Sequence, residues 1–281
     1  QYAYSRWNNG RDLTFTPQTL HDVTQMPGEA AYYAGTNEHL KSASGDTKLG
    51  LTRDEEQFTA MILTYNRDNG VKKLIERLRG CPYLNKVIIV WNNRDRMPNG
   101  TWPQIHVPIE FFLSEKNSLN SRFLPYDRIE TEAVVSIDDD MDLGQPEIVL
   151  NSFKNGRGFY GLNNQVEYSM ILTSFAFVHK EFLFEYTYNQ HPAILEYIDS
   201  HRNCEDIAIN YLVSHLTRKP PLKVVKKASL SNGAKSGLSG RGSHYTERTD
   251  CIRMFNSIYG YCPLLFSQEV ARPYGQSVKG I

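Results

Sequence analysis

From residue 58 onward, apolar residues form short runs separated by polar and helical segments. Residues 71–78 carry apolar side chains at helical spacing, and Gly80 supplies a stop signal. Strands that alternate with helical segments indicate an α/β domain over residues 57–281, with a mainly parallel sheet covered by helices on both faces. The runs that predict buried strands are residues 58–63, 87–91, 109–113 and 133–137.

The two ends of the chain have different patterns. Residues 1–56 are polar without a hydrophobic period, which is typical of an irregular lead-in or linker from an upstream domain. Residues 168–188 predict a strand and a helix, and residues 229–244 a mobile surface loop rich in Gly, Ser and Lys. Residues 205–217 suit a helix that Asn203 or Glu205 could cap. Its expected apolar face consists of Ile207, Ala208, Tyr211, Leu212 and His215.

Polar clusters follow the predicted strands at their carboxyl ends: residues 64–67, residues 92–93, and the carboxylates Asp138, Asp139 and Asp140. Ligands of parallel sheets bind beyond this edge. Consecutive carboxylates beside an apolar sheet need a counter-charge, and hard oxygen ligands suit Mg²⁺ or Mn²⁺ with open positions for substrate phosphates. The alternative interpretation is a solvated acidic turn.

Basic and amide side chains are expected at the same edge of the sheet. Arg67, Lys116 and Arg122 could hold a diphosphate, because the guanidinium fork matches its geometry, or each could be a surface charge. Asn92 and Asn93 could bond a uracil or ribose, or simply form a turn. The edge therefore has the residue types of an anion-binding site.

Carboxylates also open the helix predicted over residues 205–217. The helix dipole favours Glu205 and Asp206 there, so capping is one interpretation. In the functional interpretation, Asp206 orients an acceptor hydroxyl or stabilises a cationic sugar. Residues 215–253 hold nine Lys and Arg against two acids, which indicates either a track for an acidic acceptor or a solvated loop.

Composition excludes several classes of protein. Lys and Arg total 31 and Asp and Glu total 31, so binding to nucleic acid through global charge is not expected. No apolar run reaches the roughly 18 to 20 residues of a membrane helix. With 12 % aromatic and 40 % hydrophobic residues, disorder is excluded as the main state. The chain starts without an initiator Met or a signal-like segment, so we expect it to be part of a longer protein.

Cysteines and a sequon bear on the compartment. The four cysteines lack zinc-site spacing, and Asn99 heads an Asn-Gly-Thr sequon in a polar loop. An even cysteine count together with a loop sequon favours a lumenal or secreted compartment. A cytosolic protein with four buried thiols is the alternative.

Six blocks of this sequence, in order, resemble the C-terminal domain of the exostosin and exostosin-like proteins, glycosyltransferase family 64. The resemblance covers roughly residues 57–266, and the interval from Asn151 to Tyr168 is shorter than is usual in the family. It implies a GT-A type glycosyltransferase fold. The matching blocks are FTAMILTYNR (58–67), NKVIIVWNN (85–93), EKNSLNSRFLP (115–125), IETEAVVSIDDD (129–140), YSMILT (168–173) and NCEDIAIN (203–210), followed by Cys251 and residues 260–264.

The implied activity is that of a retaining α1,4-N-acetylglucosaminyltransferase. It would use UDP-GlcNAc with Mn²⁺, Mg²⁺ being possible, and extend a glucuronic-acid-terminated linkage tetrasaccharide or a heparan sulfate chain. The alternative is a catalytically weak partner subunit that stabilises a heparan sulfate polymerase complex. The resemblance further implies a Golgi or endoplasmic reticulum lumen, within a larger membrane-anchored protein, and a homodimer or an exostosin-family complex.

The resemblance also implies residue roles. Asp140 falls on the metal ligand, Asp206 and Arg248 on the catalytic groups, and Cys204 and Cys251 on a disulfide. In an oxidising lumen, Cys81 and Cys262 could form a second bridge. The positions that would hold the nucleotide sugar are Arg67, Asn92, Asn117, Arg122, Asp138, Asp139 and Glu205.

Overall fold

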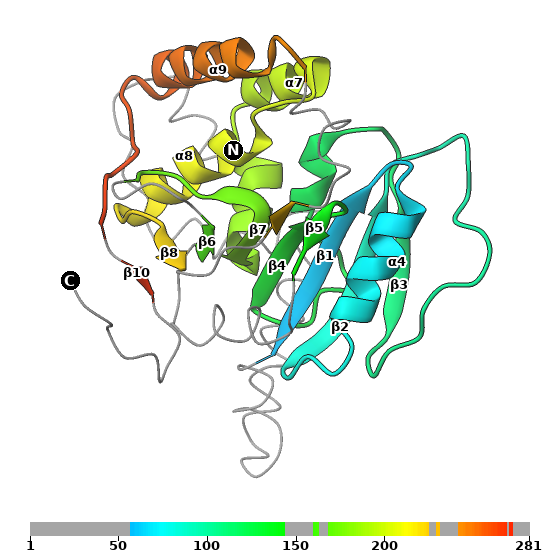
Figure 1. Cartoon of the computed structure of the whole chain (residues 1–281). Helices are drawn as coiled ribbons and strands as arrows, with labels where there is room; N and C mark the ends of the chain where they lie inside the picture. The colour runs from blue at the N-terminus through cyan, green and yellow to red at the C-terminus, as the bar shows by residue number, and fades with distance from the viewer. Residues whose placement is uncertain are drawn as a thin grey trace.

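A computed structural model describes the chain over residues 57–143, 160–162, 168–224, 229–230, 241–268 and 270–271 (Figure 1). The predicted lead-in over residues 1–56 lies outside the described residues. So do most of the interval 151–168 and much of the loop predicted over 229–244.

The domain is built on a sheet of eight strands in the order β10-β8-β6-β7-β4-β1-β2-β3. Its parallel half contains the predicted strands, namely β1 (Phe58–Thr64), β2 (Leu84–Trp91), β3 (Ile109–Leu113) and β4 (Ala133–Asp138). β7 runs antiparallel to both of its neighbours, β4 and β6, while β6, β8 and β10 pair in parallel. The prediction of a mainly parallel α/β sheet is therefore confirmed. The remaining strands are β6 (Tyr160–Leu162), β7 (Leu172–His179), β8 (Leu222–Val224) and β10 (Val270–Ala271), with β5 (Met141–Asp142) and β9 (Ser229–Leu230) forming a separate pair.

Register brings the ends of the parallel strands together. Thr64 at the end of β1 pairs with Trp91 at the end of β2, and Leu63 pairs with Asp138 at the end of β4. The polar residues that follow these strands consequently meet at one edge of the sheet.

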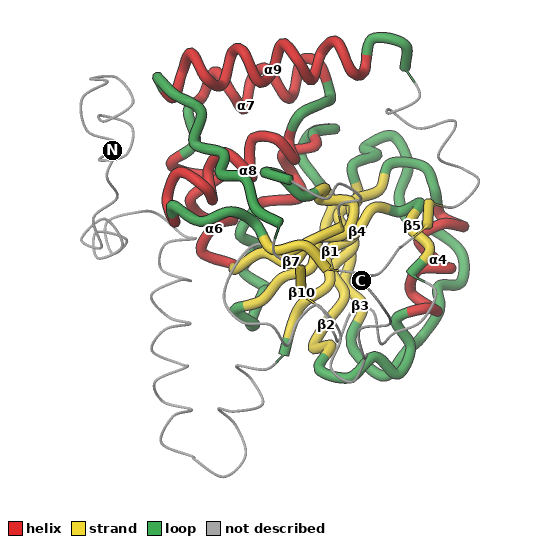
Figure 2. The backbone as a smooth tube through the Cα atoms, turned by 60° about the vertical axis from the view of Figure 1, so that its left-hand side comes forward, coloured by secondary structure: helices red, strands yellow, loops and turns green. Residues whose placement is uncertain are grey.

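Helices cover both faces of this sheet, as predicted. α4 (Asp68–Arg77) packs on one face, and its acidic first turn and basic last turn complement the helix dipole. On the other side lie α7 (Pro192–His201), α8 (Glu205–Thr217) and α9 (His244–Tyr259), grouped together in Figure 2. Shorter helical segments are η2 (Leu119–Phe123), α6 (Lys180–Phe184) and η3 (Glu185–Asn189).

Each face of the sheet has its own hydrophobic core. Along β1, Ala60 and Ile62 join the cluster beneath α4, whereas Met61 and Leu63 join the cluster that includes α7, α8 and α9. All of these residues are buried, because a strand covered on both faces has no solvent side. This explains why the sequence of β1 is a continuous apolar run.

The helix predicted over residues 205–217 has the expected bounds and a larger buried surface than expected. The residues of the expected apolar face are all buried, but so is every other residue from Glu205 to His215, because α8 is enclosed by the sheet and the other helices. The cap prediction is wrong. Cys204 occupies the cap position with a left-handed φ of 77° and no side-chain cap bond, and Asn203 bonds to α9 instead.

One of the two expected disulfides forms. Cys204 and Cys251 form a disulfide, as the resemblance implied. The second bridge does not form, because Cys81 is buried in the core beneath α4 while Cys262 is exposed. Among the residues that the structure describes, no helix is long and apolar enough to cross a membrane.

Candidate active site

The acidic triplet lies at the end of β4, against the beginning of α4. Asp139 accepts hydrogen bonds from Thr64 Oγ1 at 2.7 Å and from an Arg67 guanidinium nitrogen at 2.8 Å. The same nitrogen donates to Asp140 Oδ2 at 2.9 Å, so Arg67 links two of the three carboxylates. Gly70 is required here, since a Cβ at this position would stand 2.2 Å from the Asp139 carbonyl oxygen.

This cluster holds more negative charge than Arg67 alone can balance. Burial raises the pKa of Asp139, and burial together with the charge of Asp138 raises the pKa of Asp140. A cation bound beside Asp138 and Asp140 would relieve their repulsion. The donor set therefore fits a hard divalent ion.

The chain could supply only part of the ligands for such an ion. Within the described ranges, no group of three or more His, Cys, Asp or Glu side chains is arranged to hold a metal. Mg²⁺ and similar ions commonly take one or two carboxylates and complete their shell with phosphate oxygens and water. Asp140, with Asp138 beside it, meets that requirement.

Arg122 is the central cation of the site. Its side chain is only 7 % exposed and contacts Asp138 Oδ1 at 2.8 Å and Glu205 Oε1 at 3.4 Å. It also donates to the hydroxyl and the carbonyl oxygen of Thr173, both at 3.3 Å. One buried guanidinium thus connects the end of β4 with the beginning of α8.

Glu205 has an unusual protonation equilibrium. Burial raises its pKa to about 7, with further contributions from the charges of Asp206 and Asp138, and Arg122 offsets these only in part. The shorter contact of Arg122 is with Asp138. Three carboxylates, those of Glu205, Asp206 and Asp138, therefore share two guanidinium groups, those of Arg122 and Arg248.

Asp206 forms the second ion pair of the site, with Arg248 of α9. Two parallel contacts join them, at 2.8 and 2.9 Å, and the backbone N–H of Ile207 donates to Asp206 at 2.8 Å. A bidentate pair fixes both side chains in orientation. Because Glu205 and Asp206 are consecutive, the pairs made by Arg122 and Arg248 lie next to each other.

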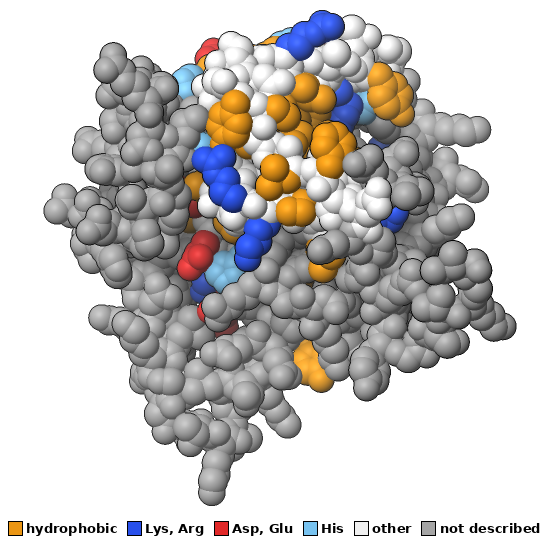
Figure 3. Space-filling view, turned by 90° about the vertical axis from the view of Figure 1, so that its left-hand side faces the viewer, with side chains coloured by type: hydrophobic (Ala, Val, Ile, Leu, Met, Phe, Trp, Pro, Cys, Tyr) orange, Lys and Arg blue, Asp and Glu red, His pale blue; other side chains and the backbone are white. Residues whose placement is uncertain are grey.

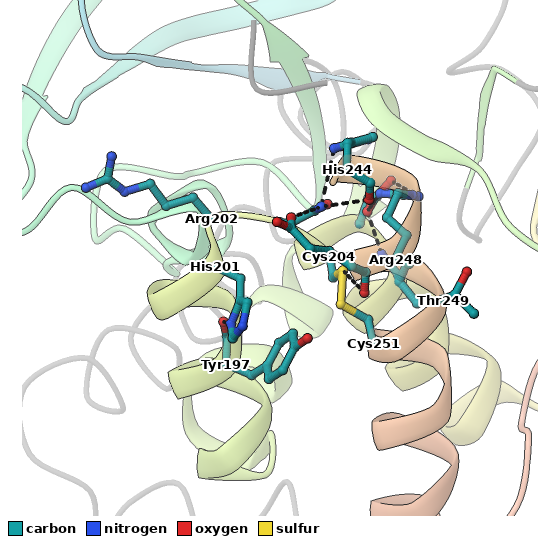
Figure 4. Close-up of a disulfide and its surroundings, with 12 residues drawn as sticks. Tyr197, His201, Arg202, Cys204, His244, Arg248, Thr249 and Cys251 are labelled. Atoms are coloured by element: carbon teal, nitrogen blue, oxygen red, sulfur yellow. Dashed lines mark hydrogen bonds and ion pairs between the residues drawn. A yellow bond between two sulfur atoms is a disulfide. The ribbon is translucent and has the colours of Figure 1, made fainter. Parts of the chain in front are cut away.

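The disulfide joins the two helices that carry this pair. Cys204 directly precedes α8 and Cys251 lies one turn after Arg248 in α9, with 6.5 Å between their Cα atoms (Figure 4). Both sulfur-bearing residues are fully buried. The bridge consequently holds Arg248 beside the start of α8.

The expected amide ligands behave differently from one another. Asn92 donates to the carbonyl oxygen of Ser118 at 2.7 Å, and its own Oδ1 is buried without a hydrogen-bond partner in the described part of the chain. Such an atom could accept a bond from a ligand. Asn93 bonds Asn66 and the backbone of Asp95, so for Asn93 the turn interpretation is the one that these contacts support.

Lys116 is paired with a carboxylate outside the acidic triplet. It contacts Asp199 of α7 at 2.5 Å, and Ser118 and Asn120 donate to the same carboxylate. Asn117 lies between these anchored residues. Asp199 thus holds the 116–120 loop, which also carries the partner of Asn92.

The remaining predicted features lie outside this cluster. Asn99 is exposed between β2 and β3, where a glycan could be attached. Four of the described cations of residues 215–253 contact different partners: Arg248 contacts Asp206, Arg253 contacts Asp250, Arg241 contacts Glu247 and Arg218 contacts Tyr261. On the face in Figure 3, Lys and Arg side chains of the described residues are scattered among hydrophobic ones.

Sequence reasoning missed Asp199 and Glu247 as contributors, and it placed Thr64 at the carboxyl edge of the sheet without giving it a role. The Thr64 hydroxyl donates a hydrogen bond to Asp139. Asp199 and Glu247 lie in α7 and α9, two helices that the pattern did not predict. Asp199 acts on residues about 80 positions away, so no local spacing could reveal it.

A mostly parallel sheet flanked by helices, with an acidic triplet at its carboxyl edge, is the arrangement of a GT-A-like glycosyltransferase domain. The family description that matches this sequence is "Glycosyl transferase family 64 domain", over residues 58–154 and 149–275. The chain belongs to this family and is a glycosyltransferase domain.

Three relatives illustrate the similarity. The Exostosin-like-3 homolog of Caenorhabditis elegans is 43 % identical over 293 residues, which cover 95 % of this chain and 36 % of the relative. Exostosin-2 of Homo sapiens is 35 % identical over 83 % of this chain, and Exostosin-1 of Mus musculus 32 % identical over 78 %. The chain spans about a third of the length of these relatives.

Proposed function

We propose that this domain transfers N-acetylglucosamine from UDP-GlcNAc to a glucuronate-terminated saccharide of the heparan sulfate type, forming an α1,4 linkage with retention of configuration. The observation that carries the proposal is the bidentate pair of Asp206 and Arg248, set directly beside Arg122, Glu205 and Asp138. The similarity of the chain to the Exostosin-like-3 homolog and to Exostosin-2 supports the choice of donor and acceptor class.

Nucleotide binding is assigned to the residues around the acidic triplet. Arg67 and Arg122 suit a diphosphate, because guanidinium groups match phosphate oxygens bidentately. The buried Oδ1 of Asn92 suits an N–H donor such as that of uracil. The contacts for the nucleotide sugar are assigned to Arg67, Asn92, Asn117, Arg122, Asp138, Asp139 and Glu205.

Asp140 is assigned as the ligand of Mn²⁺, with Mg²⁺ as a substitute. When bound, the ion neutralises the charge that develops on the phosphate of the leaving UDP. The raised pKa of Asp140, which comes from burial and then from Asp138, supports a cation at this position. The chain's own contribution is to hold Asp140 through Arg67 at 2.9 Å.

Asp206 is assigned the central chemical role. Retaining transfer builds positive charge at the anomeric carbon, and a fixed carboxylate stabilises that charge electrostatically. Two contacts from Arg248 and one from the backbone of Ile207 hold the carboxylate in place, so little reorganisation is needed during the reaction. Asp206 also lies in the buried part of α8, which suits a group that must not move.

The setting of the whole protein is also part of the proposal. A buried disulfide and an exposed sequon at Asn99 suit the oxidising lumen of the Golgi or endoplasmic reticulum. There the domain would act within a larger membrane-anchored protein, as a homodimer or in a complex with exostosin relatives. A catalytically weak partner subunit would not need the complete set of Asp140, Asp206 and Arg248, which this chain retains.

The test is a donor and acceptor panel with purified protein. UDP-GlcNAc, UDP-glucose and UDP-glucuronate are each offered with a glucuronate-terminated oligosaccharide, and the matched control is the same oligosaccharide with its carboxylate reduced. We expect transfer from UDP-GlcNAc alone, an α-linked product by NMR, and a weaker reaction with the reduced acceptor.

A metal series completes this test. Chelator should abolish transfer, and added Mn²⁺ should restore it. UDP and Mn²⁺ together should raise the melting temperature more than either alone, since a ligand that binds only the folded state stabilises it. Joint stabilisation without any transfer would instead support the partner subunit, and a β-linked product would contradict retention.

A further inference from the structure

Beyond the ion pairs of the site, one carboxylate of α9 contacts the turn that precedes Asp206. Glu247 Oε2 accepts from Asn203 Nδ2 at 2.9 Å and from Arg241 at 3.5 Å, and its Oε1 accepts from Ser243 Oγ at 2.7 Å. These hydrogen bonds lower the pKa of Glu247, the bond from Asn203 most, so the group is ionised at neutral pH.

The turn that Glu247 contacts has a strained backbone. Arg202 and Cys204 both have positive φ, 50° and 77°, and neither is a glycine. Such residues persist only where their surroundings hold them, and they gather at functional sites. Several contacts do hold this turn: Arg241 donates to the carbonyl oxygens of His201 and Arg202 at 3.1 Å, and Cys204 is in the disulfide.

Asn203, in the middle of the turn, is buried and directed at α9. Its Nδ2 donates to Glu247 and to the carbonyl oxygen of His244 at 3.2 Å. The next residues along the chain are Cys204, Glu205 and Asp206. The position of Asn203 therefore helps to set the direction in which α8 begins.

Glu247 and Arg248 are neighbours in α9 with different partners. Arg248 donates hydrogen bonds to Asp206 itself, whereas Glu247 accepts a hydrogen bond from Asn203 in the turn that precedes Asp206. Figure 4 shows Arg248 and His244 on the same side of α9 as the disulfide, close to the start of α8. Together these contacts fix the first turn of α9 against the first turn of α8.

We propose that Glu247 is a positioning residue for sugar transfer: through Asn203 it fixes the strained 202–204 turn, so that Asp206 and Arg248 meet in their bidentate geometry. This inference rests on the proposed function of Asp206. The side-chain contacts of Glu247 are with Asn203, Arg241 and Ser243, so its effect passes through the Asp206–Arg248 pair. Small displacements of catalytic groups are costly, since about 1 Å can reduce a rate by about 10²-fold.

The test compares Glu247→Ala with Asp250→Ala under saturating donor and acceptor. Asp250 is the matched control, because it is also an α9 carboxylate paired with an arginine, Arg253 at 3.1 Å, but on the exposed side of the helix. We expect Glu247→Ala to lower kcat by about tenfold with the KM for UDP-GlcNAc within about twofold, and Asp250→Ala to change neither. Glu247→Gln, which keeps an oxygen for Asn203, should recover most of the loss.

A double-mutant cycle separates positioning from general stability. In an Arg248→Ala background, Glu247→Ala should cause no further loss of kcat, because residues that act through one group are not additive. An additive loss would overturn the proposal, and so would a lowered melting temperature with unchanged kcat. Labelling of denatured, unreduced protein should find two thiols in every variant, given four cysteines and one disulfide.

Measuring Asp206→Asn in the same assay distinguishes failure of the proposed function from failure of the positioning role of Glu247. If Asp206→Asn leaves turnover intact, the proposed function fails together with the role of Glu247. If Asp206→Asn lowers turnover but Glu247→Ala does not, only the positioning role of Glu247 fails.

Discussion

Removing the disulfide between Cys204 and Cys251 tests whether it stabilises the protein by restricting the unfolded chain. The bridge joins residues 47 positions apart, and both side chains are fully buried. In the chain-entropy model, a closed loop of this length contributes about 4 kcal/mol. The double change Cys204→Ala and Cys251→Ala should therefore lower the free energy of unfolding by about that amount.

This loss is large compared with the total stability of a domain, which is typically about 5–15 kcal/mol. For a domain of this size each kcal/mol moves the melting temperature by about 2–4 °C, so we expect a decrease of about 8–16 °C. Sugar transfer should fall as well, because the bridge holds Arg248 beside the start of α8.

The assay is urea unfolding followed by fluorescence, with turnover measured on the same samples below the transition. Cys262→Ser is the control, since Cys262 is exposed and lies outside the bridge. It should leave both quantities unchanged. A loss below about 1 kcal/mol in the double variant, with the wild-type bridge verified by thiol labelling, would refute the reasoning from loop entropy.

Three further changes probe the charged groups of the site. Asp199→Ala removes the shared acceptor of the 116–120 loop, so UDP should bind several-fold more weakly by calorimetry while kcat at saturating donor stays within about twofold. Arg122→Met leaves the buried carboxylate of Glu205 and the half-buried one of Asp138 without their cation, which should cost about 3 kcal/mol in denaturant unfolding. Glu205 has its pKa raised from 4.5 to about 7, so its contribution to stability is present at low pH and is lost as the pH rises through that interval. Glu205→Gln should flatten this pH dependence, and an unchanged slope in ligand-free protein would contradict the assignment.

The sheet could be predicted well because its central strands are buried on both faces. β1, β2 and β4 are continuous apolar runs, and their polar ends meet in register at the same edge. Strand pairing beyond them could not be read from the pattern. β7 lies antiparallel beside β4, a neighbour that is distant in sequence.

The acidic triplet at the ligand-binding edge was easier to predict than the contacts of α9 that hold the start of α8. Three consecutive carboxylates at the end of a predicted strand are a recognisable pattern in the sequence, and they are Asp138, Asp139 and Asp140. α9 was not predicted, although its buried residues Cys251, Phe255 and Tyr259 recur every four positions. The contacts of Glu247 with the 202–204 turn were therefore hidden from the sequence.

Lys116 shows the limit of reasoning from loop position. Its place near the carboxyl edge of the sheet allowed two interpretations, a diphosphate contact or a surface charge. In the structure, Lys116 forms an ion pair with Asp199 of α7. The choice between Asp199 and a ligand depends on how α7 packs against η2. That packing is tertiary, and neither segment contains a local sign of it.

The most direct test of the central claim is Asp206→Asn, measured for turnover, UDP affinity with Mn²⁺ and melting temperature in the same preparation. The substitution keeps the shape of the side chain and removes the charge that would stabilise the cationic sugar. We predict a loss of turnover of at least about 10²-fold, equivalent to roughly 2.7 kcal/mol, with UDP affinity little changed. A lowered melting temperature with normal turnover would contradict the account, because Asp206 would then serve only to hold α8 against α9.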